Sequence, residues 1–89
     1  MTTMFVRHTV SDYKIWRKAY DDFAPVQKAK GVTAQAVYRA ADNPNDITIT
    51  HEFASVEAAR AFATSAELKS AMQNAGVAGA PTIWFTNQA

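Results

Sequence analysis

Cysteine is absent from this sequence of 89 residues, and glycine and proline occur only three times each. Without cysteine there are no disulfide bonds, thiolate metal sites or cysteine nucleophiles. The sequence also contains no GxGxxG, P-loop, HExxH, GxSxG or EF-hand pattern. Their absence argues against nucleotide cofactors, phosphoryl transfer and serine hydrolysis. We therefore expect a protein that works without a cofactor.

No charge of one sign dominates the sequence. Nine basic and eight acidic residues give a net charge of +1, and no block of like charge occurs. Nucleic acids and anionic membranes are bound through clusters of positive charge, so neither is an expected partner. No apolar run is long enough to span a bilayer, and the N-terminus lacks the pattern of a signal peptide. The expected location is the cytoplasm.

Apolar side chains are plentiful, at 48% of the residues. This fraction is typical of a globular protein rather than a disordered one. We expect one domain spanning residues 1–89. A chain of this size buries only about 60–65% of its unfolded surface, so a partner subunit would add useful buried area.

The pattern of apolar residues predicts four strands. Alternation in steps of two predicts strands at residues 4–10, 32–41 and 46–53, and a last strand after Pro81. A turn is expected at residues 42–45 between the second and third strands.

Two helical segments separate these strands, and each is interrupted once. Asp12 begins the first segment as an N-cap, Pro25 restarts it, and Gly31 ends it. Ser55 caps the second segment, which restarts at the capping box 64–67 and ends at Gly76. The order β-α-β-β-α-β predicts an α+β, ferredoxin-like fold with a four-stranded sheet and the helices on one face.

In this topology we expect the first and third strands to lie side by side and parallel at the centre of the sheet. The side that faces the helices should carry the more apolar side chains. The residues expected there are Val6, Val10, Ala34, Ala36, Tyr38, Ile47, Ile49, Phe53, Ile83 and Phe85.

Both histidines fall on this helix-facing side, each toward the carboxyl end of its strand. Ligands in open sheets bind at the carboxyl ends of parallel strands, where helices begin. We therefore expect His8 and His51 to share a pocket and to transfer protons, because imidazole titrates near neutral pH. Tyr38 is the expected hydrogen-bond donor to a developing enolate. The residues expected to contact the substrate are Asp12, Tyr13, Trp16 and Phe53.

Each of these residues also has a structural interpretation. A buried histidine hydrogen-bonded to a carbonyl, a core tyrosine at 38, a packed Trp16 and a capping Asp12 would look the same in sequence. A metal held by both histidines would need a third ligand from Asp12 or Glu52, and Glu52 lies on the other face of its strand. We therefore predict no metal site.

The outer sheet face is too polar for a core and too aromatic for an ordinary wet surface. Trp84 lies on it, and Arg7 or Arg39 is expected to pair there with Glu52 across strands. A homodimer formed through this face would explain the mixture. The alternative is a one-layer sheet exposed to water.

Three segments carry a family resemblance: His8-x-x-x-Asp12-Tyr13-x-x-Trp16, Phe53-Ala54-Ser55-Val56-Glu57-x-Ala59 and Met72-x-x-Ala75-Gly76-Val77-x-Gly79-x-Pro81. They resemble stand-alone proteins of the dimeric α/β-barrel superfamily, whose members include antibiotic biosynthesis monooxygenases and small polyketide cyclases. The resemblance implies a homodimer with sheets packed face to face and one pocket per subunit between sheet and helices.

The resemblance to the plant polyketide cyclases is partial. Those proteins are similar in using pocket histidines and a tyrosine to move protons, and His8 occupies a comparable strand and face. No histidine follows residue 51. Neither the late catalytic histidine of the cyclases nor the late haem ligand of the haem-degrading members therefore has a counterpart.

Three functions follow as hypotheses. The first is a cofactor-independent enzyme, cyclase-like or monooxygenase-like, that moves protons on a small aromatic or polyketide-like molecule. The second is a non-catalytic module that binds a small hydrophobic ligand. The third is a structural homodimer domain with packed, inert histidines.

Overall fold

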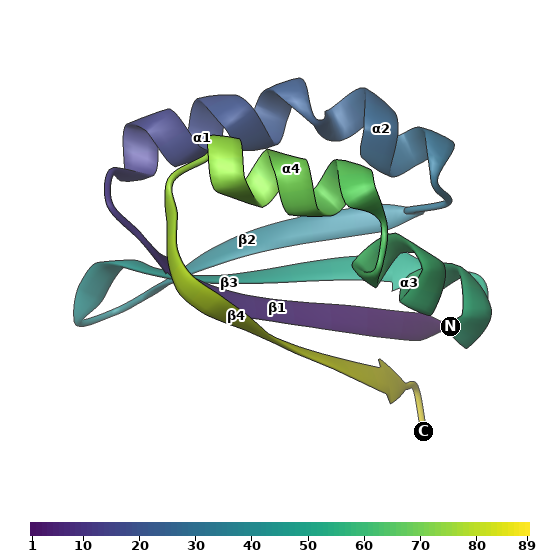
Figure 1. Cartoon of the computed structure of the whole chain (residues 1–89). Helices are drawn as coiled ribbons and strands as arrows, with labels where there is room; N and C mark the ends of the chain where they lie inside the picture. The colour runs from purple at the N-terminus through teal and green to yellow at the C-terminus, as the bar shows by residue number, and fades with distance from the viewer.

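The computed structural model describes all 89 residues and confirms the ferredoxin-like α+β fold (Figure 1). One sheet in the order β2-β3-β1-β4 has every adjacent pair antiparallel, and the helices cover one of its faces. The elements are β1 (Thr2–Val10), α1 (Tyr13–Asp22), α2 (Ala24–Ala29), β2 (Ala34–Ala40), β3 (Asn43–Phe53), α3 (Val56–Ala63), α4 (Ala66–Asn74) and β4 (Val77–Asn87).

The helices begin and end close to where the sequence predicts, except that Ser65, rather than Thr64 of the expected capping box, is the N-cap of α4. The Asp12 carboxylate accepts a hydrogen bond from the backbone N–H of Lys14 at 2.9 Å, and thereby caps α1. The Ser55 and Ser65 hydroxyls accept equivalent bonds at the starts of α3 and α4, each at 3.2 Å. Gly76 ends the last helical turn at φ +76°, a conformation that side chains with a Cβ rarely adopt.

The two central strands are antiparallel, so the prediction that they run parallel was wrong. The register runs from Thr2 opposite Phe53 to Thr9 opposite Asp46. Strands β1 and β2 run in the same direction, and the tight β2–β3 hairpin reverses the chain. Strand β3 therefore runs antiparallel to β1, which lies beside it. As a result α1 and α3 begin at opposite ends of the sheet (Figure 1), and the carboxyl ends of β1 and β3 do not meet.

Two strands begin earlier than predicted. β3 begins at Asn43, because the hairpin turn lies at residues 41–42 rather than 42–45. Its first residues have no partner on β1, so Pro44 occupies a position where a strand can lack one hydrogen bond. β4 begins at Val77, four residues before Pro81.

The faces of β2 are the reverse of the prediction. Val37 pairs with Ile49 and therefore shares its helix-facing side, while Tyr38 pairs with Thr48 on the outer face. A shift of one residue in register moves every side chain of a strand to the other face. The prediction failed because the set Ala34, Ala36 and Tyr38 is the more apolar of the two sets along β2, and the more apolar set was assigned to the helix side.

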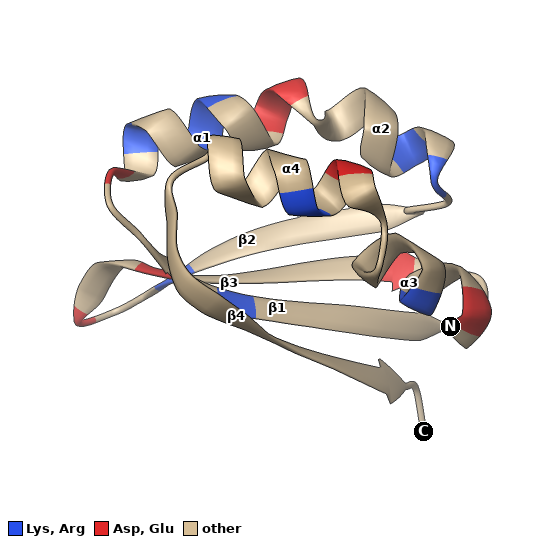
Figure 2. Cartoon of the chain, in the orientation of Figure 1, with Lys and Arg blue, Asp and Glu red and all other residues tan.

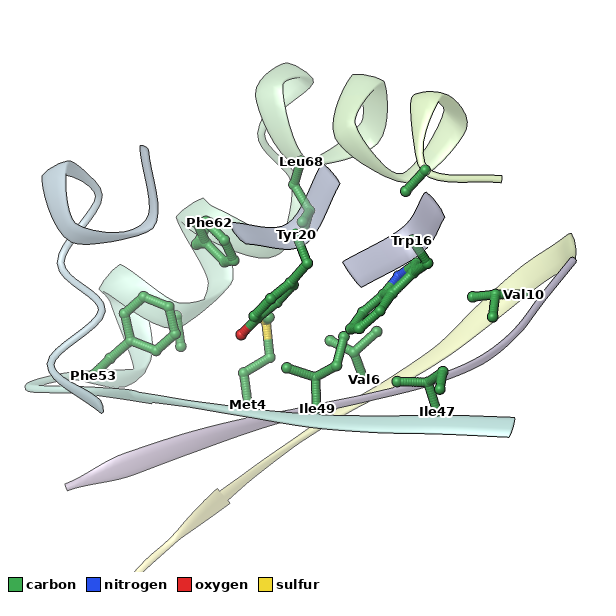
Figure 3. Packing of buried hydrophobic residues seen from close by; sticks show 12 residues of the cluster. Met4, Val6, Val10, Trp16, Tyr20, Ile47, Ile49, Phe53, Phe62 and Leu68 are labelled. Carbon is green, nitrogen blue, oxygen red and sulfur yellow. The ribbon is translucent and has the colours of Figure 1, made fainter. Parts of the chain in front are cut away.

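The core fills the space between the sheet and the helices (Figure 3). Trp16 and Tyr20 extend from α1 toward the sheet with their ring centroids 4.9 Å apart, above Val6 and Ile49. Charged residues are dispersed over the helices and loops (Figure 2), and none of the helices is long and apolar enough to cross a membrane. The buried apolar residues are Met4, Val6, Val10, Trp16, Tyr20, Ile47, Ile49, Phe53, Ala59, Phe62, Leu68 and Ala75.

Candidate functional site

A small cavity between the sheet and the helices contains both histidines. Its volume is about 30 Å³, roughly the space of one water molecule. Helices α1, α2 and α4 cover it, and β1 and β3 form its floor. The lining residues are Val6, His8, Trp16, Ala19, Tyr20, Phe23, Gln27, Ile49, His51, Leu68, Ala71, Met72 and Ala75.

The two imidazoles are buried without hydrogen-bond partners. His8 is 5% exposed and meets the edge of Trp16 at a centroid distance of 5.8 Å. His51 is 2% exposed and lies between Tyr20 at 6.2 Å and Phe62 at 5.3 Å. None of the four ring nitrogens has a hydrogen-bond partner within the protein chain. Native proteins rarely leave buried polar atoms unpaired, so these rings have binding capacity that the protein itself does not use.

Burial sets the protonation state of both rings. It lowers the pKa of His51 to about 4. Burial also lowers the pKa of His8, and the Asp46 carboxylate opposes that shift. A neutral imidazole has one N–H donor and one bare nitrogen acceptor. At neutral pH His51 therefore offers a ligand one free donor and one free acceptor.

The histidines lie at two ends of a row of aromatic rings rather than side by side. His8 pairs with Ile47 across the sheet and His51 pairs with Met4. Four residues of strand separate these positions, or about 13 Å along the sheet. Trp16 and Tyr20 fill the interval. One compact group therefore cannot touch both imidazoles.

The Tyr20 hydroxyl is already occupied. It donates a hydrogen bond of 2.6 Å to the side-chain oxygen of Gln35 on β2. Burial raises the pKa of Tyr20 to about 12, so the phenol stays protonated throughout the neutral range. Tyr20 therefore supplies a fixed aromatic wall rather than a proton donor for a ligand.

A larger hollow adjoins the histidine cavity between α4 and β4. Its volume is about 570 Å³, within the range of small-molecule sites. Leu68 and Met72 line both spaces and therefore separate them. Leu68 is the one buried residue of α4, so the other side chains of this helix are at least partly exposed. The hollow is lined by Ala63, Thr64, Ser65, Ala66, Leu68, Lys69, Met72, Gln73, Val77, Gly79, Pro81 and Ile83.

Three of the seven predicted site residues line the histidine cavity: His8, His51 and Trp16. Tyr38 does not, because the reversed faces of β2 place it on the outer side of the sheet, where it is 58% exposed. Asp12 does not line it either, since its carboxylate caps α1 at the helix end.

Tyr13 and Phe53 also lie outside the cavity. The Arg39 guanidinium lies 3.8 Å above the Tyr13 ring, a cation–π contact that covers the start of α1. Phe53 is fully buried and packs against Phe62 with ring centroids 5.6 Å apart. Its position is that of a core residue rather than a substrate contact.

Several lining residues were not predicted as site residues, notably Tyr20, Gln27, Leu68 and Met72. Sequence periodicity does place Trp16 with Tyr20, and Leu68 with Met72, on common helix faces four residues apart. That signal identifies a buried face, but it does not tell core packing from the wall of a cavity.

The outer face carries an aromatic stack and an ion pair. Phe5 and Trp84 stack with centroids 5.2 Å apart, and Trp84 is 40% exposed. Arg7 donates to both carboxylate oxygens of Asp46, at 2.7 and 3.1 Å. The expected partner of Arg7 was Glu52, which lies farther along β3, so that prediction was wrong. Arg39 pairs with Ile47 and belongs to the helix-facing side instead.

Acidic and histidine side chains do not gather in groups of three that could hold a metal ion. The two histidines have no carboxylate beside them in the cavity lining. The chemistry that this lining offers is therefore that of two imidazoles within an apolar and aromatic enclosure.

The fold is that of the antibiotic biosynthesis monooxygenases and their structural relatives. A Bordetella bronchiseptica protein, named as a candidate antibiotic biosynthesis monooxygenase, matches with a TM-score of 0.82 and 15% identity, over 99% of this chain and 96% of its own. A Caulobacter crescentus protein with the same candidate name matches with a TM-score of 0.79 and 19% identity, over 99% and 89%. SnoaB, a cofactor-independent oxygenase of Streptomyces nogalater, matches with a TM-score of 0.75 and 14% identity, over 99% and 94%.

Sequence comparison adds no closer relationship. No protein-family model matches the chain. No curated protein matches it either. At these identities the structural likeness concerns the fold, and the chemistry must be argued from the side chains.

Proposed function

We propose that this chain binds a small aromatic or polyketide-like molecule between its sheet and helices, and moves protons on it without a cofactor. The observation that carries the proposal is the pair of buried histidines whose four ring nitrogens have no partner in one shared cavity. Leaving buried polar groups unpaired destabilises a fold by about 1–3 kcal/mol each. A ligand with carbonyl or hydroxyl groups would satisfy them. A cofactor-independent oxygenase among proteins of the same fold is consistent with this chemistry.

The two histidines would have different roles. His8 is the better base, because the Asp46 carboxylate favours its protonated form and raises its pKa against the effect of burial. His8 would take a proton from the carbon next to a ketone, leaving an enolate on the ligand. His51, held neutral by burial, would hydrogen-bond a second oxygen and orient the ligand.

The ligand must occupy a larger volume than the histidine cavity offers. A space of about 30 Å³ holds no organic substrate, whereas the adjoining hollow of about 570 Å³ does. Rotation of Leu68 and Met72 side chains would join the two spaces. The distance between the histidines favours a ligand with oxygens at two well-separated positions, as in a polyketide or a fused-ring ketone.

The test uses 2-tetralone, a two-ring ketone with acidic C–H bonds next to its carbonyl. Incubation in D₂O with the protein should replace those hydrogens by deuterium, which NMR of the ketone records. The His8→Ala variant should lower the maximal exchange rate by about 100-fold or more, the usual contribution of a general base. The His51→Leu variant should leave exchange of 2-tetralone nearly unchanged, because this two-ring ketone has one oxygen and does not extend to residue 51. With a three-ring diketone the same variant should raise KM and change the maximal rate less.

Thermal unfolding of both variants provides the folding control. Binding of 2-tetralone with no deuterium exchange in the wild-type protein would favour the alternative, a non-catalytic binding module. Exchange that is unchanged in the His8→Ala variant would remove His8 from the proposed chemistry.

We also propose that two copies associate through the outer sheet face. The exposed Trp84 and Tyr38 and the Phe5–Trp84 stack leave aromatic surface on a face with no helices. The Trp84→Glu variant should shift the protein from dimer to monomer, because a buried unpaired carboxylate opposes association. Analytical ultracentrifugation measures the mass. Lys18→Glu, on the exposed surface of α1, is the control that should leave it unchanged.

A further inference from the structure

The hollow between α4 and β4 lies beside a bulge in β4. The register of β1 with β4 shifts between Arg7 and Thr9, so the three residues 79–81 of β4 lie opposite His8 alone. Gly79 adopts a φ of +75° within this bulge and lines the hollow. A bulge bends its strand and interrupts the regular pairing. The space of about 570 Å³ is therefore found where β4 departs from a regular strand.

The lining of this hollow combines apolar surface with a single charged residue. Much of the apolar surface comes from Leu68 and Met72 of α4 and Ile83 of β4. Lys69 is the one charged residue of the lining. No acidic residue lines the hollow, and the sequence of β4 contains no charged residue at all. An anion that enters the hollow would therefore be attracted by Lys69 and repelled by none of the lining residues.

The Lys69 ammonium has no partner among the acidic residues. The ion pairs of the chain involve other cations, and Glu67, the nearest acidic residue on α4, is bound by Lys30 at 2.6 Å. Lys69 is exposed while it lines the hollow, so it lies at the rim. Lysine commonly lays its carbon stem along apolar surface and keeps its ammonium in water. Its charge is thus available to a ligand that enters from solvent.

The hydroxyl groups in the same lining are already used within the chain. The Thr64 hydroxyl donates a hydrogen bond to the Arg60 carbonyl at 3.0 Å, and the Ser65 hydroxyl donates to the Phe62 carbonyl at 2.8 Å. A single free ammonium balances the one charge of a carboxylate, whereas a phosphate group carries nearly two charges at neutral pH. The lining therefore suits a carboxylate on an apolar body.

We propose that this hollow binds the carboxylate end of a ligand with a ring-sized apolar body, and that Lys69 pairs with that carboxylate. The assignment rests on the proposed function, in which the substrate would then be an aromatic or polyketide-like acid. Its carboxylate lies at Lys69, and its ketone lies behind the wall of Leu68 and Met72, in the histidine cavity. The outer sheet face proposed for the dimer is on the side away from α4 (Figure 1), so association does not cover Lys69.

The test compares two probes of the same shape, 2-naphthoate and its uncharged amide, 2-naphthamide. Isothermal titration calorimetry gives the ratio of the acid's affinity to the amide's affinity for each variant. Lys69→Gln should lower this ratio about threefold, in line with the strength of an ion pair at a partly exposed site. Lys69→Glu should lower it about tenfold, because attraction is replaced by repulsion. The amide alone should bind both variants about as well as it binds the wild-type protein.

Lys28→Glu is the matched control. Lys28 is also exposed and outside the ion pairs, but it lines a hollow beside β2, at the other edge of the sheet. The substitution changes the net charge as much as Lys69→Glu does, and it should leave the affinity ratio unchanged. An equal fall of the ratio in both variants would assign the effect to net charge and contradict the site.

Two other results would also overturn the proposal. One is a ratio that stays the same in the Lys69→Glu variant, and the other is a wild-type protein that binds neither probe. Neither probe has an acidic C–H bond next to its carbonyl, so the titration measures binding without proton transfer. It can therefore fail while the protein exchanges the hydrogens of 2-tetralone, or succeed while that exchange is absent.

Discussion

Acidification from pH 6.5 to pH 4 should lower the free energy of unfolding by about 3 kcal/mol through His51 alone. The folded protein holds this ring neutral with a pKa of about 4, whereas the unfolded chain protonates it near the ordinary value of 6.5. Between these two values the unfolded state binds more protons, so stability falls as the pH falls. Urea unfolding at a series of pH values measures the effect.

His51→Leu is the matched variant for this experiment. It should remove most of the slope between pH 6.5 and pH 4. It should also raise stability at pH 7 by about 1–2 kcal/mol, because it replaces unpaired buried nitrogens with apolar atoms. Burial of His8 adds a slope of the same sign, which remains in the variant. The ion-paired carboxylates Asp46 and Glu67 have lowered pKa values, so their stabilisation is lost mainly at still lower pH. A wild-type slope equal to that of the variant would contradict the burial of a neutral His51.

Replacing Phe53 by alanine should lower the free energy of unfolding by about 3–5 kcal/mol. Phe53 is fully buried on β3 and packs against Phe62 of α3, so its removal leaves a cavity where the sheet meets that helix. Small domains have only about 5–15 kcal/mol of stability in total, so the loss is large. Denaturant unfolding with a constant m-value measures it.

Phe5→Ala is the comparison for Phe53. Phe5 is half-buried on the outer face and stacks on Trp84. Besides the effect of its buried area, its replacement should cost about 0.5–1.5 kcal/mol for the lost ring pair. Under conditions where the Phe53→Ala variant remains folded, ketone exchange per folded molecule should change little, because Phe53 does not line the histidine cavity. Equal destabilisation by the two variants would contradict the assignment of Phe53 to the core.

The elements of this fold were predictable because their local signals are strong. The alternation of Ile47, Ile49, His51 and Phe53 with threonine and glutamate identifies β3 and its buried side without ambiguity. Asp12 and Ser55 cap helices by hydrogen bonds within three residues, so the sequence nearby suffices to find them. The cap of α4 was predicted one residue early, at Thr64 instead of Ser65.

The faces of β2 depend on contacts that are distant in sequence. Gln35 lies on the helix side because the Tyr20 hydroxyl donates to it, and Arg39 lies there because it covers the Tyr13 ring. A helix with buried tyrosines needs polar partners for them on the facing strand. That requirement was a usable signal in the sequence. It predicts that Gln35 and Arg39, rather than the exposed Tyr38, lie on the side of β2 that faces the helices.

Part of the candidate site could also be predicted from local sequence patterns. Strand alternation placed His8 and His51, and helical spacing placed Trp16, correctly between sheet and helices. The error in strand direction brought the histidines too close together, since antiparallel strands carry their carboxyl ends to opposite edges of the sheet. No local pattern marks the bulge opposite His8 or the wall formed by Leu68 and Met72, because both arise from how β4 and α4 meet the rest of the chain.

The central claim is that the unpaired histidine nitrogens form a ligand site. Its most direct test is ¹⁵N NMR of the histidine rings at pH 7, recorded as enolisable ketones of one, two and three fused rings are added. We expect two-ring and three-ring ketones to shift the ring-nitrogen signals of His8, and three-ring ketones also to shift those of His51. If no ketone of the series shifts either histidine, although both rings are neutral and buried, the cavity is packing rather than a site.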